Sequence, residues 1–158
     1  MSRRVALTNG GFAVVDDEDY SRVSKWRWHS HREGKNIYAV RQVSLGAGKT
    51  STIRLHRFIL SAPARVLVDH RNGNGLDCRR SNLRLASQAQ NLSNRGPNSN
   101  NSSGYKGVSF NKQIGKWTAK IGVNYKTINL GVFETAQDAA NAYAVAAHKL
   151  HGEFSRTE

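Results

Sequence analysis

Residues 68–91 read VDHRNGNGLDCRRSNLRLASQAQN, and this stretch decides the fold that we expect around it. Strands are predicted at residues 66–69 and 82–85, on either side of a loop rich in Gly and Asn. A helix is predicted to begin near Ser87. The order strand, strand, helix predicts a small ββα motif.

Four polar residues within this stretch suit the hydrolysis of a phosphodiester with the help of one metal ion. His70 can take a proton from water, and Asp69 precedes it directly. Carboxylate and amide oxygens, as in Asp69 and in the later Asn82 and Asn91, are hard ligands of the kind that Mg²⁺ accepts. An Asp-His pair alone is more often part of a turn, but the full run favours a site.

The same run resembles the HNH nucleases, of the phage and homing-endonuclease kind. The resemblance implies that His70 is the general base, that Asn82 braces the loop, and that Asp69 and Asn91 bind Mg²⁺ or Mn²⁺. Asn91 stands where the family name expects His, and it keeps a ligand oxygen. The resemblance is carried by Asp69, His70, Asn72, Gly73, Leu76, Asp77, Arg79, Asn82, Leu83, Arg84 and Asn91.

Composition limits the partners and the compartment. The 158 residues carry a formal net charge of +13, which favours a polyanionic partner. An anionic membrane surface is the rival partner, but the sequence has no long apolar run. Cys78 is the one cysteine, which excludes an intrachain disulfide and a CxxC zinc site. The first residues lack the apolar core of a signal peptide, so we expect a cytoplasmic protein of a bacterium or a phage-infected host.

The first sixty residues are predicted to form short strands. Residues 5–15 are predicted to form a hairpin, with the acidic run 16–19 as a turn and helix start. Trp26 and Trp28 alternate with polar residues, which predicts that both lie on one strand face in the core. Residues 46–51 lack the frame of a phosphate loop and are predicted to be a hairpin turn, so no nucleotide cofactor is expected. His56, in a predicted helix at 55–60, either packs or aids the site.

The boundary between two modules is predicted in SNRGPNSNNSSG, residues 93–104. This segment has no apolar residue to bury and is predicted to be a flexible linker. The predicted domains are a nuclease domain at 1–95, with its ββα core at about 66–94, a linker at 96–103 and a second domain at 104–158.

The second domain is predicted to be a three-stranded antiparallel sheet followed by one helix. Apolar and polar residues alternate over 105–110, 116–123 and 125–133, as in half-buried strands. Thr135 is the predicted N-cap of the helix, and Gly152 its stop. Together the two domains predict an α+β protein.

This region resembles the AP2 DNA-binding domain, whose sheet lies in a DNA groove. Residues 104–155 contain no arginine, so the sequence favours phosphate contacts over the reading of bases. The motifs that carry the resemblance are GYKGV (104–108), GKWTAKI (115–121), LGVF (130–133), AANAY (139–143) and HGEF (151–154). The predicted DNA-contacting residues are Arg80, Arg84, Lys106, Lys116, Lys120 and Lys126.

The sequence therefore predicts a metal-dependent endonuclease that cuts double-stranded DNA with its first domain and grips it with the second. A fragment ending near Arg95 is predicted to keep the full catalytic set. The alternatives are a non-catalytic DNA-binding regulator with a degenerate nuclease fold, and an RNA-binding protein. Nicking or double-strand cutting, and monomer or dimer, stay open.

Overall fold

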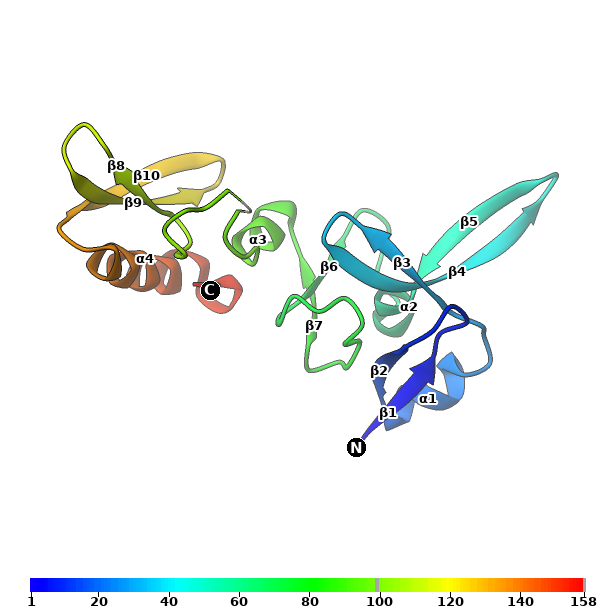
Figure 1. Cartoon of the computed structure of the whole chain (residues 1–158). Coiled ribbons are helices and arrows are strands. Elements are labelled where there is room, and N and C mark those ends of the chain that lie inside the picture. Colours follow the sequence, from blue (N-terminus) through cyan, green and yellow to red (C-terminus); the bar gives the residue numbers. More distant parts are fainter. Residues whose placement is uncertain (99, 158) are drawn as a thin grey trace. The chain divides into compact units, whose positions relative to one another are not determined.

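The fold is known from a computed structural model that describes residues 1–98 and 100–157 (Figure 1). It is a mixed α and β structure with several small antiparallel sheets, which confirms the predicted class. Ser99, in the predicted linker, and Glu158, at the end of the predicted second domain, lie outside the described residues. Within the described part of the chain, no helix is both long and apolar enough to cross a membrane.

The chain forms two compact units, Met1–Ala86 and Ser87–Glu158, and each is described by itself. This division differs from the predicted borders at residues 95 and 104. The difference arises because the short helix after Ser87 groups with the residues that follow it. The two units describe how contacts are distributed along the chain. Which segments fold as independent domains stays a prediction.

The first unit contains seven strands in three antiparallel sheets, and two helices, among its described residues 1–86. Strand β1 pairs with β2, strands β3, β4 and β5 form a sheet in that order, and β6 pairs with β7. The elements are β1 (Ser2–Ala6), β2 (Phe12–Asp16), α1 (Asp17–Val23), β3 (His29–Glu33), β4 (Asn36–Gly46), β5 (Lys49–Arg54), α2 (Leu55–Leu60), β6 (Leu67–His70) and β7 (Leu83–Ala86).

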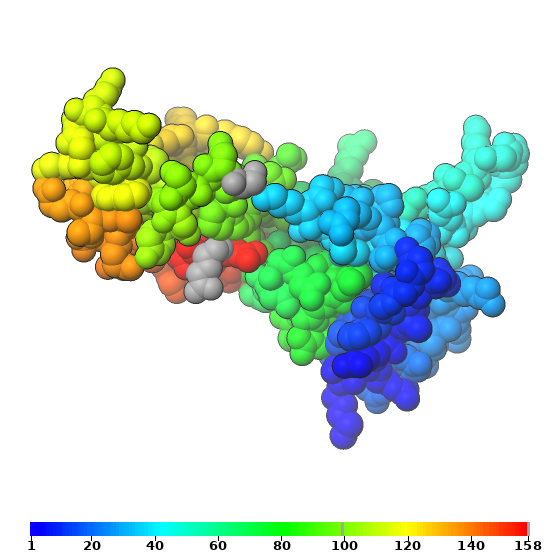
Figure 2. Space-filling view, viewed as in Figure 1, coloured from blue at the N-terminus to red at the C-terminus, as the bar shows by residue number. Residues whose placement is uncertain are grey.

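Several predicted elements of this unit are confirmed. The hairpin β1–β2 aligns Val5 with Ala13, and the acidic run forms the first turn of α1. The predicted hairpin turn at 46–51 joins β4 to β5, and residues 44–52 of this hairpin are all exposed. Figures 1 and 2 show the β4–β5 hairpin, in cyan, projecting from the rest of its unit.

The core of the first unit forms around Trp28. This side chain is fully buried, its Nε1 donates to the carbonyl oxygen of Val23 at 3.0 Å, and its ring centroid lies 5.7 Å from that of Phe58. Trp26 is 47% exposed and lies under the guanidinium of Arg41, 4.1 Å from its ring centroid. The prediction that both tryptophans share a buried strand face is therefore wrong for Trp26. The cause is local, because both residues precede β3, so strand alternation does not apply to them.

The loop between β6 and β7 packs against the first hairpin. The backbone N–H of Val14 donates to the oxygen of Leu76 at 2.8 Å, and that of Cys78 donates to the oxygen of Val14 at 2.7 Å. Cys78 is completely buried, and burial raises the pKa of its thiol to about 12. The thiol is therefore part of the core of this unit.

The second unit begins with a capped helix. Ser87 accepts a hydrogen bond from the backbone of Gln90, whose side chain bonds back to the backbone of Ser87. Figure 1 shows α4 along one face of the sheet, where Ala139, Tyr143 and Ala147 are buried. The elements are α3 (Gln88–Ser93), β8 (Val108–Asn111), β9 (Lys116–Val123), β10 (Lys126–Phe133), α4 (Ala136–His151) and the 3-10 turn η1 (Gly152–Phe154), with sheet order β10-β9-β8.

The end of the predicted linker is a hydrogen-bonded turn. The side chain of Asn101 donates to the oxygen of Tyr105 at 2.7 Å and accepts from the backbone of Ser103 and Gly104. The hydroxyl of Ser103 approaches the oxygen of Val108 at 2.9 Å. Asn and Ser favour such turns because their side chains bond to nearby backbone. Residues 101–103 therefore have a defined local structure.

Gly107 allows the chain before β8 to lie against α4 and β9. Its φ is +72°, and a Cβ there would meet the ring of Tyr143 and lie 2.5 Å from the oxygen of Lys120. We expect Gly107→Ala to lower the free energy of unfolding of this unit by about 3 kcal/mol, from overpacking and backbone strain. Urea denaturation measures it. Gly104→Ala is the matched control, because Gly104 has φ +77° but open space, so only the strain remains. Equal effects of the two variants would contradict the packing argument.

Candidate functional site

Asp69 and His70 are the last two residues of β6. They pair across the ladder with Arg84 and Leu83 of β7, and both side chains are buried. The strand gives the pair its orientation, because consecutive strand residues point to opposite faces. The loop of residues 71–82 starts directly after His70.

Asn82 ties the two ends of this loop together. Its Oδ1 accepts from the backbone N–H of Asn72 at 3.0 Å, and its Nδ2 donates to the carbonyl oxygen of Asp77 at 2.7 Å. The side chain is buried, so both bonds are shielded from water. Asn82 is therefore placed to hold the loop that follows His70.

A buried carboxylate, Asp77, reinforces the loop. The guanidinium of Arg79 donates to it through Nε at 2.7 Å and Nη2 at 2.6 Å, and Asn72 donates at 2.9 Å. The hydrogen bond from Arg79 lowers the pKa of Asp77 below its usual range. The ionised carboxylate is thus a fixed anchor for both sides of the loop.

The imidazole of His70 lies in an aromatic pocket with His56 and Tyr38. The His70 and His56 rings meet edge-on with centroids 4.9 Å apart, and the Tyr38 ring is 5.9 Å from that of His70. Gly75 makes this packing possible, because a Cβ there would meet the ring of Tyr38 at 2.6 Å. His56, for which packing and a site role were both open, is thus in direct contact with His70.

Burial keeps both histidines neutral at neutral pH. It lowers the pKa of His70 to about 4, against the opposing pull of the Asp69 and Asp77 carboxylates. It also lowers the pKa of His56 to about 3, where His70 adds to the effect. A neutral imidazole can accept a proton, which a general base must do.

The same shifts predict how stability depends on pH. In the unfolded chain both imidazoles bind a proton near pH 6.5, but in the folded protein only near pH 4 for His70 and pH 3 for His56. Below pH 6.5 the unfolded chain therefore binds more protons, so we expect the free energy of unfolding to fall from pH 6.5 toward pH 4. Urea denaturation in EDTA across this range measures the slope. His56→Phe should reduce the slope and His31→Gln, at an exposed position of β3, should not.

Arg84 forms a buried ion pair with Asp69. Its Nε and Nη2 each lie 2.7 Å from Oδ2 of Asp69, and both side chains are about 6% exposed. The prediction that Arg84 contacts DNA does not match this position, because a buried guanidinium needs its counter-charge inside the protein. Arg84 instead orients the carboxylate of Asp69.

Arg80 is also held by protein carboxylates. Its Nε and Nη2 donate to the two oxygens of Asp19 at 2.7 and 2.8 Å, and its Nε lies 2.9 Å from Glu18. Asp16, Glu18 and Asp19 are the one set of three metal-ligating side chains that gather together in residues 1–98 and 100–157. Arg80 thus joins α1 to the loop, and because its side chain stays 43% exposed, its contact with DNA stays a prediction.

The four predicted DNA-contacting lysines differ in exposure. Lys120 on β9 and Lys126 on β10 are exposed, whereas Lys116 forms an ion pair with Glu134 at 2.5 Å. Lys106 is half-buried and donates to the carbonyl oxygen of Ser93. Lys120 and Lys126 are thus the best placed of the four for a phosphate contact.

The first unit brings together Asp69, His70 and Asn82, and adds Arg84 and the aromatic pocket. Asn91 lies half-buried on α3 in the second unit, so its pairing with Asp69 stays a prediction. Sequence reasoning missed Tyr38, which carries no local signal because it meets His70 only through the tertiary fold. Asp77 is one of the residues that carry the family resemblance, but its role as an anchor of the loop became visible only in the structure.

Comparison with known proteins agrees with this geometry. The family model described as HNH endonuclease matches residues 61–93. An uncharacterized HNH endonuclease of Acanthamoeba polyphaga mimivirus is 34% identical over 152 residues, which is 92% of this chain and 74% of that protein. The similarity extends along almost the whole chain and includes the buried Asp-His pair with the loop that follows it. The chain belongs to the HNH endonuclease family.

The C-terminal part is similar to a second group of proteins. The AP2-like ethylene-responsive transcription factor TOE2 of Arabidopsis thaliana is 46% identical over 66 residues, 42% of this chain and 13% of that protein. The APETALA2-like protein 2 of Oryza sativa subsp. japonica is 47% identical over 58 residues, 37% of this chain and 13% of that protein. Both predicted resemblances are thereby confirmed.

Proposed function

We propose that the protein is a metal-dependent endonuclease that hydrolyses phosphodiester bonds in double-stranded DNA. One observation carries the proposal, namely a buried, neutral His70 between Asp69 and a loop braced by Asn82. The proposal includes the ββα arrangement of β6, β7 and α3, and a homing or phage role. The AP2-like module is assigned to holding the duplex.

His70 has the features of a general base in this reaction. Its neutral imidazole takes a proton from the attacking water, and the His56 and Tyr38 rings fix its orientation by contact. Asn82 keeps the loop after His70 closed through its two backbone hydrogen bonds. The protein thus supplies the base already positioned, which reduces the entropic cost of reaching the transition state.

The donor chemistry of the predicted metal residues fits a hard divalent cation. Asp69 offers a carboxylate and Asn91 an amide oxygen, the ligands that Mg²⁺ and Mn²⁺ accept. The thiol of Cys78 is completely buried with a raised pKa, so it does not suit a soft-metal site. The bound ion would polarise the scissile phosphate and stabilise the leaving 3′-oxygen. Arg84 holds Asp69 in one orientation, as outer partners of ligands do.

The second unit is assigned to non-specific contact with the duplex. Lys120 and Lys126 are exposed on adjacent strands of the sheet, where ammonium groups suit phosphate oxygens. Lysine contacts to phosphates hold a protein on DNA without reading bases, and they weaken strongly with salt. Cleavage at a preferred sequence would therefore need contacts beyond these lysines.

A second candidate function is a DNA-binding regulator without catalysis. The Asp69–Arg84 ion pair favours it, because the carboxylate already has a positive partner inside the protein. In that case the protein would bind DNA in the presence or absence of a metal ion and would not cut it.

Incubation with supercoiled plasmid distinguishes the two functions. With Mg²⁺ or Mn²⁺ we expect nicked or linear plasmid, and with EDTA intact plasmid. A gel shift on the same samples records binding. Binding without cutting in either metal would support the regulator and end the nuclease proposal. The His70→Ala variant, purified in parallel, shows whether any cutting comes from a contaminant.

A further inference from the structure

Helix α3, which carries Asn91, is too short and too exposed to be stable without contacts to other elements. It is six residues long, and none of its six described residues is buried. Isolated helices of this length are not stable in water, so the position of α3 depends on its partners. Its capping box at Ser87 fixes only the N-terminal end.

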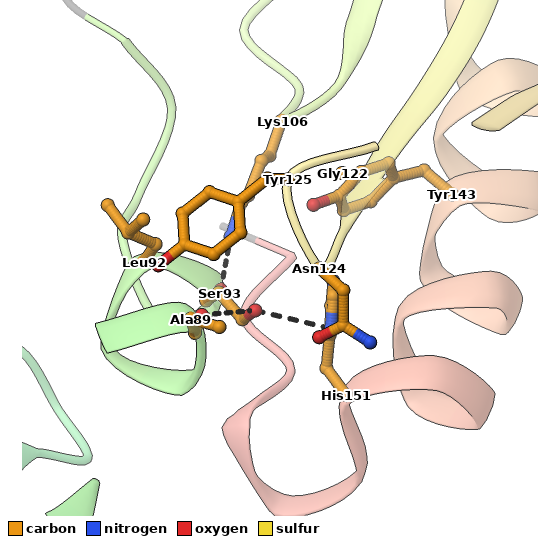
Figure 3. A pocket seen from close by; sticks show the side chains of 9 residues that line it. All are labelled: Ala89, Leu92, Ser93, Lys106, Gly122, Asn124, Tyr125, Tyr143 and His151. Atoms are coloured by element: carbon orange, nitrogen blue, oxygen red, sulfur yellow. Dashed lines mark hydrogen bonds between the residues drawn. The ribbon is translucent and has the colours of Figure 1, made fainter. Parts of the chain in front are cut away.

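The partners at the C-terminal end come from the AP2-like module. The ammonium of Lys106 donates to the carbonyl oxygen of Ser93, the last residue of α3 (Figure 3). A cation at this end faces the negative pole of the helix dipole, which is favourable. Lys106 precedes β8 by two residues, so the bond joins α3 to the sheet.

His151, at the end of α4, makes a second contact with the same residue. Its Nδ1 lies 3.2 Å from the hydroxyl oxygen of Ser93. That hydroxyl donates its single proton to the oxygen of Ala89 at 3.0 Å. In this arrangement Nδ1 of His151 carries a hydrogen and donates it to Ser93. The contact thus connects α4 with both the last turn and the first turn of α3.

Ser93, Lys106 and His151, which make these polar contacts, also line a cavity beside α3. A cavity of about 220 Å³ is lined by residues of α3 and by residues of the module that include Tyr125 and Tyr143 (Figure 3). Leu92 is the largest apolar side chain that α3 offers to this cavity. The apolar packing that α3 offers here is therefore limited largely to Leu92, and the contacts of Lys106 and His151 to Ser93 tie the end of α3 to the module.

We propose that Lys106 and His151 are positioning residues, which hold α3 and thereby set the position of Asn91 for metal binding. The inference rests on the proposed function for the role of Asn91. It gives the AP2-like module a task beyond holding DNA, because Lys106 and His151 belong to the module and hold the helix that carries Asn91. It also changes the expectation for a fragment ending near Arg95, which keeps α3 but lacks both positioning residues.

The test uses the full chain with Lys106→Met. We expect amide hydrogen exchange in residues 87–95 to become at least several-fold faster, and Mn²⁺ affinity, measured calorimetrically without DNA, to fall roughly 10-fold, as for outer partners of metal ligands. Lys106→Arg keeps a cationic donor and should restore part of both.

Lys126→Met is the matched control, because it removes the same charge from an exposed position on β10. It should weaken DNA binding and leave both exchange and Mn²⁺ affinity unchanged. Unchanged exchange in Lys106→Met, or faster exchange with unchanged Mn²⁺ affinity, overturns the inference. If Lys106→Met does not fold, Ser93→Ala removes only the hydroxyl contact to His151 and is judged by the same two measurements. Failure of the parental protein to cut DNA would contradict the proposed function. The exchange and Mn²⁺ measurements test only whether Lys106 and His151 position α3.

Discussion

Replacing His70 with alanine is expected to lower the rate of DNA cleavage by roughly 10²- to 10⁴-fold, the usual contribution of a positioned general base. The imidazole is neutral because it is buried, and its removal leaves no imidazole base at the end of β6. DNA affinity should stay unchanged, because the exposed lysines lie on another sheet. Single-turnover cleavage at saturating metal measures the rate, and a gel shift measures the affinity.

His56→Phe is the control for this variant. It keeps an aromatic ring against His70 but removes the second imidazole, so a large loss of rate should be specific to His70. Parental cleavage by a purified His70→Ala protein would show that another group acts as the base. A comparable loss in both variants would instead point to a base shared by the two histidines.

The second large effect is expected for Asp69→Ala, which should abolish cutting and also destabilise the first unit. The variant leaves Arg84 buried without this carboxylate, and breaking a buried ion pair in this way costs about 3–5 kcal/mol. Loss of activity alone is therefore ambiguous, since an unstable protein also fails to cut. Urea denaturation of the variant measures the cost in stability.

The double variant Asp69→Ala/Arg84→Leu separates the two effects. An apolar residue in place of the guanidinium removes the uncompensated charge, so much of the stability should return. Cutting should not return, because the metal ligand is still missing. Recovery of cleavage in the double variant would show that Asp69 acts only as the partner of Arg84.

Local signals in the sequence predicted many elements of the fold. Strand β9 has the predicted bounds, because apolar alternation, Gly115 and Asn124 mark it on the sequence itself. Thr135 caps α4 as predicted, and α3 begins directly after Ser87, where a helix start was predicted, because helix starts depend on residues within one helical turn. The Asp-His pair and Asn82 were singled out by residue type and spacing, and the resemblance implied their roles.

The failures have the opposite character, since each concerns a partner distant in the sequence. Arg84 was assigned to DNA as a surface cation, but it is buried against Asp69, a partner that spacing does not reveal. The ion pair between the exposed Arg80 and Asp19 was not predicted either. Tyr38 reaches His70 from another sheet, and Lys106 bends back to Ser93. Charge and periodicity predict which residues are polar, whereas the choice of partner depends on tertiary packing.

The buried Cys78 gives the first unit a natural reporter of its own opening. An alkylating reagent reaches this single thiol only when the loop between β6 and β7 separates from β2. The labelling rate therefore measures the free energy of that opening, without interference from the second unit, which contains no thiol. The labelling rate of Cys78 should therefore rise in variants that loosen the His70 loop and stay unchanged in variants that loosen only α3.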